Sequence, residues 1–207
     1  MAFETWLAFA AASAVLLAIP GPTILLVVAY ALGAGRRTAL WTVAGVFFGD
    51  LLAITLSVMG LGVILATSSA LFTALKWIGG AYLIWLGWKL FTSPVSGETV
   101  SVRGADKSGR AMLIHAFAVT ATNPKSIVFF VAFLPQFVNP AASAMPQLAA
   151  MVATFTILGA LNALIYAIAA GGLRERIKRP SVMRWLNRGG GTALMAMGAL
   201  TFLVRRA

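Results

Sequence analysis

LAFAAASAVLLAIPGPTILLVVAYAL, residues 7–32, is an apolar run long enough to cross a bilayer, and Pro20-Gly21-Pro22 interrupts it near its middle. A helical span needs roughly 20 apolar residues. A proline removes a backbone donor and frees a carbonyl, which in hydrocarbon must find another partner or a water-lined cavity. Broken helices at membrane depth are typical of transporters. The sequence therefore predicts a functional site at this break.

A second break, Asn123-Pro124-Lys125, lies in another apolar run, and similar runs recur along the chain. With 60% hydrophobic and 10% charged residues, the 207-residue chain is excluded from the soluble globular class. We predict an all-α integral membrane protein with a single transmembrane domain over residues 1–207 and helices 1 and 4 broken at proline. The six predicted transmembrane helices lie near 7–32, 39–61, 71–91, 112–134, 148–170 and 189–204.

The connections between these runs differ in charge. Those at 33–38, 92–110 and 173–188, together with Lys89, hold twelve basic residues, whereas 62–70 and 135–147 hold none. The positive-inside rule places basic connections in the cytoplasm and hence both termini outside, although Arg205 and Arg206 run against it. The net charge of +11 is then a topology signal, and no nucleic-acid partner is expected.

The two halves of the chain resemble each other. Gly79-Gly80-Ala81-Tyr82-Leu83 and Gly87 match Gly190-Gly191-Thr192-Ala193-Leu194 and Gly198, while Pro22 matches Pro124 more loosely. We predict a first half at 1–91, a cytoplasmic linker at 92–110 and a second half at 111–207. Because three spans per half is an odd number, the repeat must be inverted, and inverted repeats place binding sites at their interface near the midplane.

Asp50 is the only acid inside a predicted span, where a charge costs about 2.5–3.5 kcal/mol on insertion scales. It is interpreted as a carboxylate that titrates protons or binds a substrate amine, or as half of a fixed ion pair with Lys125 or Lys76, and the two interpretations are compatible. Other residues at the same predicted depth have similar alternatives. Lys125 could bind a substrate carboxylate or extend its ammonium to the membrane surface. The prolines could open a site or only kink a packed helix, and the asparagines could bind substrate or only bridge helices. The candidate pathway residues at this depth are Pro20, Gly21, Pro22, Asp50, Asn123, Pro124, Lys125 and Asn162.

Several chemistries find no support in the sequence. The chain has no cysteine and one histidine, His115, which is interpreted as an interfacial residue, so no metal site is expected. No phosphate-binding Gly-rich loop occurs, and no nucleophile and base stand out at a common depth, so neither a cofactor nor an enzyme is expected. Glycines that would let helices approach closely are Gly45, Gly49, Gly79 and Gly80.

The motifs together resemble those of the LysE-type amino-acid translocators, the lysine and homoserine/threonine efflux superfamily. They cover both halves in order: Ile19-Pro20-Gly21-Pro22, Gly45 to Gly49-Asp50, Lys76-Trp77-Ile78-Gly79-Gly80-Ala81-Tyr82-Leu83 with Gly87, and Asn123-Pro124-Lys125 followed by Phe129-Phe130 and Phe133-Leu134-Pro135-Gln136-Phe137. The resemblance implies an exporter of amino acids or related small metabolites in the bacterial inner membrane, driven by the proton gradient. It also adds Lys76 to the pathway residues.

We therefore expect a secondary active exporter that works by alternating access, with a small-molecule substrate, protons and the lipid bilayer as its partners and a homo-oligomer as an open possibility. The alternative from another class is a passive channel or a membrane subunit that anchors a larger complex. In that case the broken helices would line a pore or serve structure alone.

Overall fold

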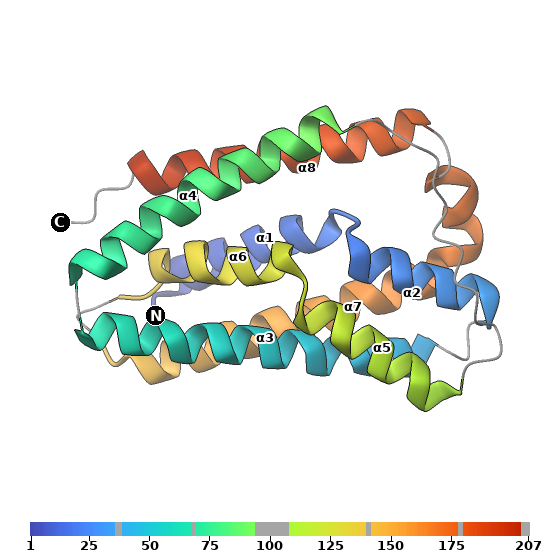
Figure 1. Cartoon of the computed structure of the whole chain (residues 1–207), viewed down its shortest axis with the longest axis horizontal. Coiled ribbons are helices and arrows are strands. Elements are labelled where there is room, and N and C mark those ends of the chain that lie inside the picture. Colours follow the sequence, from blue (N-terminus) through green and yellow to red (C-terminus); the bar gives the residue numbers. More distant parts are fainter. Residues whose placement is uncertain (36–38, 68, 94–107, 140–141, 178–179, 204–207) are drawn as a thin grey trace.

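The structure, a computed structural model, describes residues 1–35, 39–67, 69–93, 108–139, 142–177 and 180–203, with some side chains near helix ends excepted. This part of the chain is helical and contains no strand (Figure 1). The helices are α1 (Phe3–Ala18), α2 (Pro22–Gly33), α3 (Ala39–Thr67), α4 (Ser69–Thr92), α5 (Gly109–Ala121), α6 (Pro124–Phe133) with the 3-10 turn η2 (Leu134–Gln136), α7 (Ala144–Ile177) and α8 (Pro180–Leu203).

Both predicted proline breaks are present. The helix axes of α1 and α2 differ by 56°, and those of α5 and the α6–η2 segment by 43°. Pro22 and Pro124 each stand in the first turn of the following helix, where a missing N–H costs nothing and the fixed φ favours helix. Asn123 caps α6, because its Oδ1 accepts a hydrogen bond from the Lys125 backbone N at 3.1 Å.

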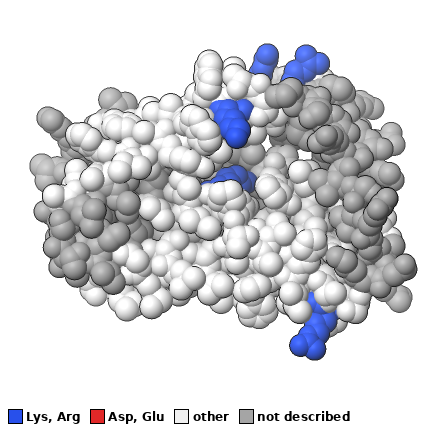
Figure 2. Space-filling model, in the orientation of Figure 1, with Lys and Arg blue, Asp and Glu red and all other residues white. Residues whose placement is uncertain are grey.

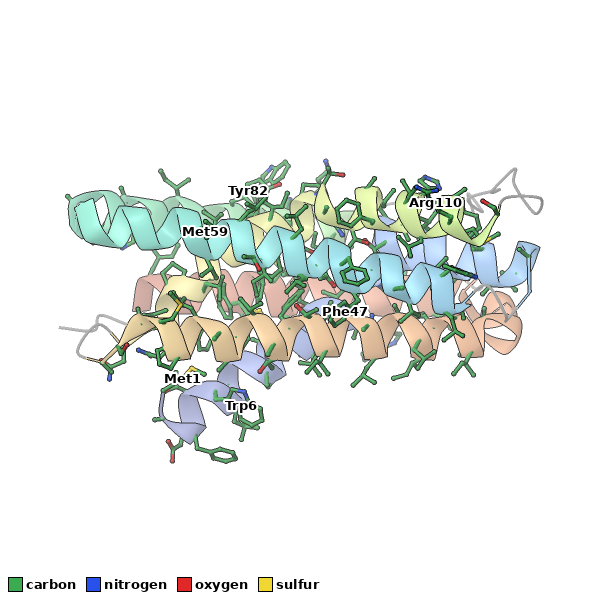
Figure 3. The ribbon with its side chains drawn as sticks, turned by 90° about the horizontal axis from the view of Figure 1, so that it is seen from below. Met1, Trp6, Phe47, Met59, Tyr82 and Arg110 are labelled. Carbon is green, nitrogen blue, oxygen red and sulfur yellow. The ribbon has the colours of Figure 1, made fainter. Side chains whose placement is uncertain are left out.

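Among the described residues, two unbroken helices are long and apolar enough to span a membrane, at Ala39–Gly60 and Ala144–Ala170. The two bent pairs are further candidates if each counts as one span. Figure 3 shows α3 and α7 running along the length of the molecule, with Met1 and Arg110 toward opposite ends. Described side chains on the face in Figure 2 are mostly uncharged, as lipid contact requires. A full set of six spans, with α4 and α8, stays a prediction.

Close helix pairs hold this arrangement together. At Gly45 and Gly49, α3 lies so near α5 that an added Cβ on Gly49 would come within 2.7 Å of the Thr120 Cβ. Glycine also brings α4 and α8 side by side (Figure 1): a Cβ on Gly198 would lie 2.6 Å from the Gly80 carbonyl oxygen. Gly79 is buried on α4.

The basic stretch 173–188, predicted as a connection, is mostly helical. Helix α7 continues to Ile177 and α8 already begins at Pro180. Arginine, lysine and leucine are good helix formers, and a proline in the first turn does not interrupt a helix. Most of the linker predicted at 92–110 lies outside the described residues. In Figure 1 the beginning of α1 and the end of α8 lie at the same end of the bundle, opposite the end of α2.

Candidate functional site

The end of α1 carries backbone carbonyls that the helix itself cannot satisfy. In a continuous helix, the carbonyls of Leu16 and Ala18 would accept from the N–H groups four residues later. Those positions are Pro20 and Pro22, which have no N–H. The Ile19 N–H donates to the Leu16 carbonyl at 3.3 Å instead, whereas Ala18 loses its helical donor, so acceptors near the end of α1 need donors from elsewhere in the bundle.

Side chains from the second half of the chain supply these donors. The ammonium of Lys125, on α6, donates to the carbonyl oxygens of Leu16 at 3.1 Å and Ile19 at 2.8 Å. On α7, Asn162 Nδ2 donates to the carbonyl of Leu17 at 3.0 Å, and the Tyr166 hydroxyl donates to that of Ala18 at 2.8 Å. Every carbonyl from residue 16 to residue 19 therefore accepts a hydrogen bond from a side chain of α6 or α7.

The beginning of α2 contacts the second break in turn. The Asn123 amide Nδ2 donates to Thr23 Oγ1 at 3.2 Å, and the Thr120 hydroxyl donates to the same oxygen at 3.4 Å. All three side chains are buried. The two breaks are thus joined directly by polar contacts.

Asp50 on α3 is buried next to α7 at Gly159. A Cβ on Gly159 would collide with Asp50 Oδ2, so the carboxylate can hold its present position because residue 159 is glycine. Among the residues that the structure describes, Asp50 forms no hydrogen bond and no ion pair within 4 Å. An ion pair between Asp50 and Lys125, one of the structural interpretations, is therefore not formed here: the lysine donates to backbone carbonyls instead.

A cavity of about 20 Å³ lies between the two breaks. This is the volume open to the centre of a water-sized sphere, and a buried water needs at least about 10–15 Å³ of it. The cavity therefore has room for a water molecule and is too small for an amino acid. Opposite charges meet at it, since Asp50 and Lys125 both contribute to its wall. Its lining residues are Leu17, Gly21, Thr23, Ile24, Val46, Asp50, Asn123, Lys125, Ser126, Gly159 and Asn162.

The predicted pathway residues fall into three groups. Gly21, Asp50, Asn123, Lys125 and Asn162 line the cavity. Pro20, Pro22 and Pro124 shape the breaks beside it without being among the lining residues. Lys76 lies on α4, but its side chain is outside the described residues.

Sequence reasoning missed Thr23, Ser126, Gly159 and Tyr166. Thr23 and Ser126 follow each break by one or two residues, so their position next to the prolines was an available signal. On α7, Gly159, Asn162 and Tyr166 follow one another at helical spacing and so share a face. His115, expected at the interface, contacts Tyr30: its Nδ1 lies 2.8 Å from the tyrosine hydroxyl.

Comparison with known proteins places this chain in a family. It is 33% identical over 207 residues to the homoserine/homoserine lactone efflux protein of Salmonella typhimurium, covering 100% of both chains. It is also 33% identical over 202 residues to an uncharacterized membrane protein of Vibrio cholerae, and the match covers 97% of both chains. A leucine efflux protein of Enterobacter sp. is 30% identical over 125 residues, which cover 60% of this chain and 59% of that protein. No solved structure matches the chain. Residues 14–205 match the family model described as LysE type translocator, and the chain therefore belongs to the LysE type translocator family.

Proposed function

We propose that this protein is a secondary active exporter of amino acids or related small metabolites across the bacterial inner membrane, and that it exchanges substrate for protons by alternating access. The observation that carries the proposal is the cavity between the two broken helices, with one carboxylate and one ammonium in its wall. Ionisable side chains inside a membrane domain are costly, and they typically mark substrate or ion pathways.

Relatives suggest the size and chemistry of the substrate. The names of similar proteins specify efflux of homoserine and its lactone in one case and of leucine in another. All three compounds are small and carry an α-amino group. The cavity is smaller than any of them, so loading requires the two halves to move apart, as alternating access implies.

An inverted repeat would give this movement its symmetry. The correspondence that aligns Gly80 with Gly191 and Gly87 with Gly198 also exchanges two contacts between α4 and α8. A Cβ added to Gly198 would lie 2.6 Å from the Gly80 carbonyl oxygen. In the corresponding contact, a Cβ added to Gly87 would lie 2.6 Å from the Gly191 carbonyl oxygen. The matching contacts support a pseudo-two-fold axis between halves 1–91 and 111–207.

Asp50 is the proposed proton carrier. Its carboxylate is buried at the cavity, with no ion pair among the described residues that would fix its charge. In the proposed cycle Asp50 binds a proton from outside and releases it inside. The protein then returns to its outward-facing state as it carries substrate out. Both termini would face outward, as the charges of the connections predict.

The substrate screen that tests this function measures each amino acid, and homoserine lactone, inside and outside cells with and without the protein. We expect lower internal accumulation and higher external concentration for a small group of α-amino compounds. Unchanged distribution of every compound tested, with the protein present in the membrane, would contradict an export function.

Gly159→Ala is expected to reduce transport on the order of tenfold or more, because the added methyl group displaces the Asp50 carboxylate and displacements near 1 Å at a functional centre have effects of this size. Gly60→Ala is the matched control, since a Cβ there meets nothing within 4 Å on the same helix as Asp50. Initial efflux rates from proteoliposomes, normalised to the amount of folded protein, provide the comparison. Equal rates for the two variants would exclude the predicted contact between residue 159 and Asp50.

A further inference from the structure

The four carbonyls at the end of α1 are not satisfied in the same way. Neutral donors, the Asn162 amide and the Tyr166 hydroxyl, each take a single carbonyl, at Leu17 and Ala18. The other two, those of Leu16 and Ile19, converge on one ammonium group, Lys125 Nζ. This convergent pair is therefore built to hold a primary ammonium.

The position of Lys125 is not explained by the stability of its own helix. It stands in the first turn of α6, where the helix dipole disfavours a positive charge. Its ammonium instead reaches the C-terminal end of α1, where the dipole favours a cation, over separations of 106 and 109 residues in the chain. The ammonium of Lys125 thus binds to the first half of the protein rather than to its own half.

The second charge of the cavity has no such partner. Asp50 lines the same cavity, and no hydrogen bond or ion pair satisfies its carboxylate among the residues described here. An incoming α-amino compound would bring an ammonium, which matches the two carbonyls. The displaced Lys125 ammonium would then be free to pair with Asp50 or with a substrate carboxylate, all within one cavity.

We propose that the carbonyls of Leu16 and Ile19 form the subsite for the substrate's α-ammonium, and that Lys125 occupies this subsite when no substrate is bound. The inference rests on the proposed export function and specifies its substrate class: compounds with a free α-ammonium, whether or not they carry a free carboxylate. Lys125 acts as an internal substitute for the substrate. It ties the halves together in the empty protein, and substrate replaces that tie.

This substitution has a kinetic consequence. Net efflux requires the empty protein to return through a closed state, whereas exchange of internal for external substrate does not. If Lys125 closes the empty state by satisfying the carbonyls, its loss removes this donor from the Ile19 carbonyl and leaves the Leu16 carbonyl with only the 3.3 Å bond from the Ile19 N–H, in that state alone. Net efflux is then impaired more than exchange.

Lys125→Met tests the proposal in proteoliposomes loaded with labelled homoserine. Net efflux into substrate-free buffer is compared with exchange against external unlabelled homoserine, and we expect the ratio of the two rates to fall about tenfold or more, as for a bias of 1.4 kcal/mol or more against the closed empty state. Lys89→Met is the matched control: this lysine lies over the Trp85 ring on α4, away from the cavity, and its loss should leave the ratio unchanged. A folded Lys125→Met protein in which the ratio is unchanged, or in which net efflux and exchange are both lost, would overturn the proposal.

A competition measurement on the unsubstituted protein does not depend on the folding of a variant. Homoserine lactone, which keeps the ammonium and lacks a free carboxylate, should compete with homoserine efflux, whereas N-acetylhomoserine, which lacks the ammonium, should not. Equal competition by the N-acetyl compound would refute the ammonium subsite. Failure of the proposed function is distinguishable from both results, since the unsubstituted protein would then move no α-amino compound in either mode.

Discussion

Asp50→Asn is expected to abolish proton-driven efflux while leaving folded protein in the membrane. Asparagine has nearly the same shape, so the space left by Gly159 remains filled and the contact between α3 and α7 persists. What disappears is the group that can gain and lose a proton at the cavity. Because Asp50 is the only acid in the predicted spans, no neighbouring carboxylate is available to replace it.

The measurement is efflux of labelled homoserine from membrane vesicles with and without an imposed proton gradient. Glu4→Gln serves as the control, because it makes the same chemical change in the first turn of α1, on an exposed residue. We expect this control to respond to the gradient as the unsubstituted protein does. Undiminished gradient-driven transport by Asp50→Asn would remove the carboxylate from the coupling mechanism.

The second large effect is expected on stability, where α4 and α8 meet. A Cβ on Gly191 would lie 2.8 Å from the Phe91 backbone N, so Gly191→Ala must push the two helices apart. Overpacking of this kind costs about 1–3 kcal/mol. At Gly189, two residues earlier on α8, a Cβ meets nothing within 4 Å. There alanine should instead stabilise the helix, by up to about 1 kcal/mol from its better helix propensity.

The two variants and the unsubstituted protein are purified in one detergent and heated. Loss of monodisperse protein after heating gives the unfolding temperature of each. The two alanine variants should shift the unfolding temperature in opposite directions relative to the unsubstituted protein. A Gly191→Ala protein as stable as Gly189→Ala would show that the close approach of α4 and α8 does not contribute to stability.

The broken helices could be predicted from sequence because their cause is local. A proline has no N–H wherever it stands, so Pro20, Pro22 and Pro124 specify breaks without knowledge of the rest of the fold. Hydrophobic runs likewise locate the helices, since the bilayer sets their length. Helix ends outside the bilayer follow weaker rules, which is why α7 and α8 extend into the basic stretch that was predicted to be a connection.

The partners in the site could not be predicted, because they depend on how helices distant in sequence are placed. Asn162 and Tyr166 bind carbonyls 145 and 148 residues away, and a backbone carbonyl has no signature in the sequence. The same limit applies to Lys125. Its charge next to a proline marked it as a candidate, but its contact with the carbonyls of Leu16 and Ile19, rather than with Asp50, depends on where the fold places the beginning of α6 relative to the end of α1.

The central claim, that the cavity between the breaks couples substrate export to protons, is tested most directly by recording both fluxes in the same proteoliposomes. Labelled homoserine leaving the vesicles and internal pH are followed together while an inward proton gradient is imposed. The account predicts that the gradient accelerates efflux, even against a homoserine gradient, and that substrate leaving is accompanied by internal acidification. Homoserine movement that follows its own gradient and ignores the proton gradient would contradict the account and indicate a passive channel.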